Sequence, residues 1–184
     1  GPRSTPTIAD GKVYVLGPKG LLVCLDAAEG STVWSKNLVD DFGGKSGGWG
    51  FSESPFVDGD KVVIGPGGSD SPVVALNKDN GNTIWKASGF SVGGSKAEYA
   101  TVVALDLNGR RQYLRLFNDK LVSLDSETGD LLWSTDWPGG QSPAVIPTPI
   151  ADGDEILIAS GYGVGSKLVK IDADNQPSDV WQEK

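Results

Sequence analysis

The segment LVSLDSETGDLLW, residues 121–133, decides how this chain folds, because three further versions of it occur at nearly even spacing. They read LVCLDAAEGSTVW at 22–34, VVALNKDNGNTIW at 73–85 and, with one inserted residue, LVKIDADNQPSDVW at 168–181. The tryptophans that close them are separated by 51, 48 and 48 residues. A period of this length indicates a fold built by repeating one supersecondary unit.

A second repeated block precedes each version and predicts four strands in every unit. Its hairpin signals are Asp10-Gly11, Asp58-Gly59, Asn108-Gly109 and Asp152-Gly153. Such pairs favour a two-residue type I′ turn, because both central residues of that turn need a positive φ. In the first unit we expect strands at about 4–9, 12–17, 21–26 and 32–38. Lys96–Leu107 has helical propensity, but its place in the repeat predicts a strand, and no other stretch predicts a helix.

These patterns predict an all-β fold, a β-propeller built of four-stranded antiparallel blades. Residues 1–184 form a single propeller segment, with blades expected at about 1–40, 50–88, 97–137 and 143–184. A β-sandwich is the second interpretation, but a sandwich does not require near-identical units.

The composition excludes several classes of function. Asp and Glu number 24 against 16 Lys and Arg, for a net charge of −8, which argues against nucleic acid or an anionic membrane surface as a partner. The chain has no histidine, so nucleophile–histidine catalysis and histidine-ligated metals are excluded for these residues.

Cys24 is the single cysteine and is expected to be a small core residue. No apolar run is long enough to span a membrane. The chain has no initiator methionine, so we expect a processed, trimmed or fragmentary product.

The repeated corner and tryptophan resemble the tryptophan-docking motif of quinoprotein-like propellers, and the likeness covers essentially the whole chain. It is most similar to bacterial secreted proteins of the planctomycete type called PQQ-binding-like β-propeller repeat proteins. The resemblance implies a periplasmic or extracellular location and a structural role, holding blade against blade, for a set of residues. These are Asp26, Gly30, Trp34, Gly81, Trp85, Asp125, Gly129, Trp133, Asp172 and Trp181. The fourth unit departs from the motif, because Gln176-Pro177 replaces the Thr-Gly corner.

Such proteins usually close a ring of seven or eight blades, so four units are half of a ring, with apolar faces left open at both ends. Three interpretations follow. The chain is a fragment of a longer propeller, whose other blades are its partners; or it pairs with a second copy to complete eight blades; or it closes alone as a four-bladed ring. We favour the first and place the second next.

Glycine positions predict where a site lies. Seven glycines belong to tight turns at one end of the strands, and eighteen belong to the long connections at the other end, which we call the loop face. Long loops on a rigid scaffold commonly carry binding sites. The candidate binding residues there are Lys45, Trp49, Glu53, Glu98, Tyr99, Gln141 and Tyr162.

Glu53 and Glu98 begin inner strands and are expected to point toward the central channel, either for acid–base or cation chemistry or simply as hydrogen-bonded carboxylates. Trp49 either stacks on a ligand or packs its own loop.

The sequence therefore predicts a non-enzymatic, extracytoplasmic platform that binds or assembles other proteins through its loop face. The first alternative is part of the catalytic domain of an alcohol or sugar dehydrogenase that uses pyrroloquinoline quinone (PQQ) and calcium. A structural subunit of a surface layer or filament is the second alternative. We expect no cofactor and no metal, because the calcium ligands of true quinoproteins do not map onto this chain and the adjacent cysteines found in many of them are missing. The acidic run Asp172–Asp179 lacks the glycine and glutamate of a calcium loop and is interpreted as an elaborated turn.

Overall fold

A computed structural model describes residues 3–138 and 144–184, and within them the chain forms four antiparallel sheets of four strands each. The first sheet contains β1 (Thr7–Ala9), β2 (Lys12–Leu16), β3 (Leu21–Asp26) and β4 (Thr32–Asn37). The second contains β5 (Phe56–Asp58), β6 (Lys61–Ile64), β7 (Val74–Asn77) and β8 (Thr83–Lys86). The third contains β9 (Val103–Leu107), β10 (Arg110–Leu116), β11 (Lys120–Asp125) and β12 (Leu131–Asp136). The fourth contains β13 (Ile150–Asp152), β14 (Glu155–Ser160), β15 (Gly165–Ile171) and β16 (Pro177–Glu183).

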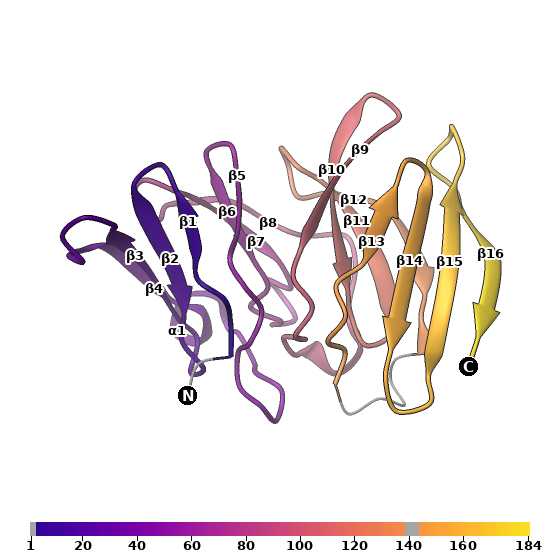
Figure 1. Cartoon of the computed structure of the whole chain (residues 1–184), viewed down its shortest axis with the longest axis horizontal. Coiled ribbons are helices and arrows are strands. Elements are labelled where there is room, and N and C mark those ends of the chain that lie inside the picture. The colour runs from indigo at the N-terminus through magenta and orange to yellow at the C-terminus, as the bar shows by residue number, and fades with distance from the viewer. Residues whose placement is uncertain (1–2, 139–143) are drawn as a thin grey trace.

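Each sheet is an up-and-down meander whose strand order follows the sequence. Figure 1 shows the four sheets, here called blades 1 to 4, standing side by side from indigo to yellow. Hairpin turns such as β9–β10 and β15–β16 project at the top of the view, whereas α1 (Leu38–Phe42) and the N-terminus lie at the bottom. The tight turns and the long connections therefore lie at opposite ends of the strands, as the glycine pattern predicts.

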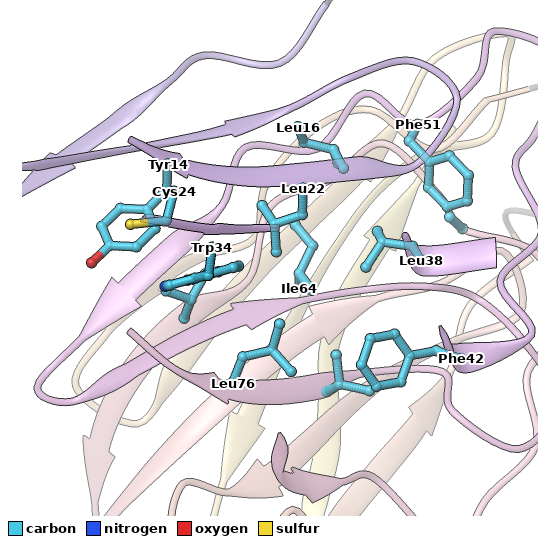
Figure 2. Packing of buried hydrophobic residues seen from close by; sticks show 13 residues of the cluster. Tyr14, Leu16, Leu22, Cys24, Trp34, Leu38, Phe42, Phe51, Ile64 and Leu76 are labelled. Carbon is cyan, nitrogen blue, oxygen red and sulfur yellow. The ribbon is translucent and has the colours of Figure 1, made fainter. Parts of the chain in front are cut away.

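Three apolar layers hold consecutive blades together. The first layer joins Tyr14, Leu22 and Trp34 of blade 1 to Ile64 and Leu76 of blade 2. In Figure 2 the side chains of the two sheets meet face to face in this layer, with α1 closing one end. Corresponding clusters lie between blades 2 and 3 and between blades 3 and 4. Cys24 is fully buried in the first layer, where the sequence predicts a small core residue.

Several elements differ from the sequence expectation. β1 begins at Thr7 rather than near residue 4, and the helix α1 forms where none is expected. The fourth strand of the first unit ends at Asn37 rather than residue 38, because the Asn37 side chain accepts a hydrogen bond from the Val39 backbone and caps the short helix α1. Within Lys96–Leu107 only β9, from Val103, is a strand, although the segment contains no helix, as predicted. Residues before β9 are held by other contacts, since the Ala97 N–H donates to the Lys45 carbonyl at 2.6 Å. A single turn of 3₁₀ helix, η1 (Gly93–Ser95), precedes them.

Candidate functional site

Three of the four repeated tryptophans, Trp34, Trp85 and Trp133, lie at the junctions between the described blades, whereas Trp181 is partly exposed on β16. The indole of Trp34 covers Gly81 of the next blade so closely that a Cβ there would be 2.9 Å from the ring. Its Nε1 donates to the Lys78 carbonyl at 2.9 Å. Trp85 makes the same pair of contacts one blade further on, with Gly129 and with the Ser126 carbonyl at 3.0 Å. We call this combination of indole, glycine and carbonyl an interblade joint.

An Asp or Asn side chain at each corner holds the turn, and in blades 2 and 3 this turn receives the tryptophan of the preceding blade. Oδ1 of Asp26 accepts hydrogen bonds from the backbone N–H groups of Ala28 and Glu29, both at 2.9 Å. Asp125 holds its own turn in the same way. Asp172 accepts from the backbone of Asp174 and Gln176, so the acidic run at 172–179 is a turn between β15 and β16.

The third junction departs from this pattern. Trp133 Nε1 donates to Oε1 of Gln112, in its own blade, at 3.0 Å. Gln112 Nε2 in turn donates to Asn175 of blade 4 at 3.2 Å. Asn175 has a φ of 58° and so takes the left-handed position that glycine holds in the other blades. The fourth blade thus replaces the missing glycine with a residue type that tolerates this conformation and supplies a polar side chain.

A pocket of about 340 Å³ lies on the loop face and gathers side chains from the connections of all four blades. It is lined by Arg3, Trp49, Ser52, Tyr99, Ala144, Ile146 and Tyr162. Three of the seven candidate binding residues are therefore brought together here, namely Trp49, Tyr99 and Tyr162.

The pocket wall is built by contacts among its own aromatic side chains. Trp49 and Tyr99 pack edge to face, with ring centroids 6.0 Å apart. Arg3 donates from Nη1 to the Trp49 carbonyl at 2.8 Å, which holds the N-terminal segment beside this loop. Tyr162 stands at the rim with a φ of 60° and an exposed fraction of 68%. Ile146 is 57% exposed and Trp49 is 44% exposed, so part of the apolar lining of the pocket is accessible to solvent.

Glu53 and Glu98 do not line this pocket, because both are buried around Arg115. The Arg115 guanidinium lies 2.6 Å from Oε2 of Glu53 and donates to the carbonyls of Glu98 and Ala100. Glu53 also accepts from the Gly65 N–H at 3.0 Å. Burial raises the pKa of the Glu53 carboxyl above its usual value, against the opposing charge of Arg115. This arrangement joins the inner ends of blades 2 and 3 through a buried charge pair.

The second carboxylate of the cluster has a different environment. Glu98 Oε1 lies 3.6 Å from the Lys96 ammonium, and Oε2 accepts from the Val145 N–H at 3.4 Å. Burial raises the pKa of Glu98, while the Lys96 charge opposes the shift. Lys45 lies apart, exposed, and bonds through its backbone to Pro66 and Ala97. Gln141 lies outside the described residues.

Arg3 and Arg115 are functional candidates that the sequence reasoning does not select. A signal for Arg115 exists, because it is an arginine flanked by Leu114 and Leu116 in the buried second half of β10. A buried arginine needs a carboxylate partner, and Glu53 and Glu98 begin the segments before neighbouring inner strands. Arg3 carries no comparable pattern, since it precedes the first strand.

These side chains do not fit a quinone held by calcium. Each buried carboxylate already faces a cation, Arg115 for Glu53 and Lys96 for Glu98. Among the residues that the structure describes, no three Asp, Glu, His or Cys side chains gather closely enough to hold a metal ion. Calcium prefers six to eight oxygen ligands, and this donor set does not supply them.

The whole chain matches the model of a known protein family. The model of the family described as outer membrane protein assembly factor BamB matches residues 1–184. The chain belongs to this family of PQQ-like β-propellers. The resemblance seen in the repeated segments is therefore confirmed at the level of the family.

Individual relatives are of two kinds. The chain is 28% identical over 145 residues to quinoprotein ethanol dehydrogenase of Pseudomonas aeruginosa, a match that covers 72% of this chain and 22% of that protein. It is 32% identical over 87 residues to outer membrane protein assembly factor BamB of Salmonella typhimurium, covering 46% of this chain and 18% of the relative. The chain thus spans about a fifth of these relatives.

Solved structures confirm the all-β propeller and its four blades. BamB from Moraxella catarrhalis superposes with a TM-score of 0.66 at 20% identity, over 98% of this chain and 49% of that one. Quinohemoprotein alcohol dehydrogenase from Comamonas testosteroni gives a TM-score of 0.71 at 16% identity, over 100% of this chain and 35% of that one. Across 3–138 and 144–184, none of the helices has the length and apolar character needed to cross a bilayer.

Proposed function

We propose that this chain is a non-enzymatic, extracytoplasmic binding platform that holds another protein through its loop face. The observation that carries the proposal is the pocket on that face, where Trp49, Ile146 and Tyr162 remain exposed beside Arg3. Large apolar side chains that gather around a hollow indicate an interaction site, whereas scattered ones do not.

The pocket chemistry favours a protein partner. Trp, Tyr and Arg are the residue types that contribute most binding energy at protein interfaces. The rim offers apolar area for one or two side chains of the partner, and the Arg3 guanidinium offers a site for a carboxylate. Trp49 and Tyr99 brace each other, which lowers the entropy lost when a partner binds.

The relatives support the same interpretation without deciding it. One group is named for outer membrane protein assembly, and the other for alcohol oxidation. Because Glu53 and Glu98 are committed to cations within the fold, the chain's own residues favour the assembly role over the oxidation role. The assembly role also accounts for our proposal of a periplasmic or extracellular location.

A labelled peptide binding assay tests the proposal. The probe is a ten-residue peptide that alternates apolar and polar residues, contains one Phe and ends in a free carboxylate. Trp49→Ala and Tyr162→Asn should each weaken binding by about fivefold to thirtyfold, the range expected for interface anchors. Asn is chosen at 162 because it tolerates the positive φ of that position. Ile84→Ala is the matched control, since Ile84 is 39% exposed on β8, outside the pocket lining.

Equal affinity for the wild-type chain and the two pocket variants would contradict a role for the pocket. The dehydrogenase alternative is tested separately by adding PQQ and calcium and measuring thermal stability and dye reduction. We propose that this chain binds no such cofactor, so neither quantity should change. A thermal shift together with dye reduction would favour the dehydrogenase.

A further inference from the structure

Charged side chains are arranged differently at the two ends of the strands. At the tight-turn end the cations pair with carboxylates, as Lys12 does with Asp79 at 2.9 Å and Lys78 does with Asp10. The other described cations of that end are paired in the same way, and they are Lys61, Arg110, Arg111 and Lys170. The positive charge of the tight-turn end is therefore neutralised within the fold.

Three cations of the loop face have no such partner. Across residues 3–138 and 144–184, the side chains of Arg3, Lys19 and Lys45 form no ion pair with a carboxylate. All three residues are exposed. Arg3 donates to the carbonyl of Trp49, which is a neutral group, so its charge stays uncompensated. Positive charge that the fold leaves uncompensated attracts negative charge from a partner.

The carboxylates nearest to Lys45 in the sequence are engaged elsewhere. Asp40 and Asp41 accept hydrogen bonds at the start of α1. Glu53 is buried against the Arg115 guanidinium. Of the residues that the structure describes, those flanking Lys45 therefore supply no counter-charge for it.

Backbone contacts hold Lys19 beside the pocket. It lies in the connection between β2 and β3, where the Pro18 carbonyl accepts from the Phe51 N–H at 3.0 Å. Phe51 stands between Trp49 and Ser52, and both of these line the pocket. The loop that carries Lys19 is thus bonded to the loop that forms one wall of the pocket.

Lys45 approaches the pocket through a second pair of bonded segments. Ser46 and Ala97 form a parallel β-bridge, and the Ala97 N–H donates to the Lys45 carbonyl. The two segments continue to Trp49 and Tyr99, the aromatic pair of the pocket wall. Four residues of chain span at most about 14 Å, so Lys45 and Trp49 lie within reach of one short peptide segment.

We propose that the loop-face pocket takes an acidic segment of the partner protein, with an apolar side chain in the pocket and carboxylates facing Arg3, Lys19 and Lys45. This inference rests on the proposed function, because it names the chemistry of the protein that the pocket holds. Complementary charge at the rim of an interface raises the association rate and fixes the orientation of the partner. The chain has a net charge of −8, so an acidic segment is repelled elsewhere and is drawn to the end where cations are free.

Three peptides of equal length test the charge of the partner. Each contains one Phe, is blocked at both termini and differs from the others only at three positions, which are all Glu, all Gln or all Lys. At low salt the wild-type chain should bind the Glu peptide about tenfold more tightly than the Gln peptide, and the Lys peptide least tightly. At about 0.5 M salt the difference between the Glu and Gln peptides should fall to about twofold, because screening weakens exposed charge pairs. Fluorescence anisotropy measures the dissociation constants.

Two double variants with the same net charge separate local from total charge. Lys19→Gln with Lys45→Gln removes two unpaired cations of the loop face. Lys170→Gln with Arg110→Gln is the matched control, since these side chains are 51% and 56% exposed at the tight-turn end. The loop-face variant should associate with the Glu peptide about threefold to tenfold more slowly, with a nearly unchanged dissociation rate, whereas the control should behave as the wild-type chain. Equal losses in the two variants would overturn the inference, and circular dichroism checks that both remain folded.

The outcomes distinguish this inference from the proposed function. If the three peptides bind equally well and Trp49→Ala weakens all of them, the pocket holds a partner whose charge is irrelevant, and this inference alone fails. If none of the peptides binds, or Trp49→Ala changes nothing, the proposed function fails together with it.

Discussion

Gly81 and Gly129 have two separate reasons to be glycine, and the chain allows these reasons to be separated. Gly129 has a φ of 77°, and a Cβ there would lie 2.5 Å from the Trp85 ring. Gly109 has a nearly equal φ of 72° but open space around it. Gly109→Ala should cost about 1–2 kcal/mol from the left-handed backbone alone. Gly129→Ala should cost about 1–3 kcal/mol more from overpacking against the indole.

Urea unfolding of the two variants measures this difference as a shift in midpoint at constant slope. Equal losses for Gly109→Ala and Gly129→Ala would mean that the indole contact contributes nothing beyond the backbone conformation. The structural role that the resemblance implies for Trp85 and Gly129 would then fail.

At the residue scale, the sequence identifies side chains that recur in several blades but not those whose role occurs in a single blade. Asp26, Gly30 and Trp34 could be selected because three more copies show which positions matter. Arg115 could not, since its role depends on Glu53 and Glu98 approaching from other elements. Residues that recur in every blade can be recognised from the sequence alone. A cluster that forms once, such as the one around Arg115, shows no repeated pattern and is therefore much harder to recognise.

The segment leading into β9 shows how buried charge modifies an element. Its Glu98 carboxyl is buried beside Lys96, and burial raises its pKa above the usual value of 4.5. The folded state then binds this proton more tightly than the unfolded state. The contribution of Glu98 to stability is therefore complete below pH 4.5 and is lost as the pH rises through the folded pKa.

Glu98→Gln should accordingly flatten the pH dependence of stability above pH 4.5, because the variant has no proton to lose. The free energy of unfolding from urea titrations at several pH values measures the slope. Glu53 shares the same direction of pKa shift, so part of the slope should remain in the variant. Glu155→Gln, at an exposed position of β14, is the control. A slope identical to that of the wild-type chain would contradict the assignment.

Elements follow the repeat except where side chains or loop contacts override it. The register correctly predicts a strand rather than a helix before residue 107, but not that β9 begins only at Val103. The late start follows from the bonds that hold Ala97, Glu98 and Ala100 to Lys45 and Arg115. Helix α1 was missed for a similar local reason, the cap supplied by Asn37.

The whole molecule combines a repeated scaffold with two unequal ends, and the repeat itself predicts which blades are stable. Among residues 3–138 and 144–184, blades 2 and 3 have an apolar layer on both sides, whereas blades 1 and 4 have one each. Stability in stacked repeats is a sum of unit and nearest-neighbour terms. Amides of β1–β3 and β14–β16 should therefore exchange faster than those of β6, β7, β10 and β11.

Hydrogen exchange of the wild-type chain, followed strand by strand, measures this gradient. If the strands of blades 1 and 4 were as protected as those of blades 2 and 3, the apolar layers between blades could not be what sets the order of local unfolding.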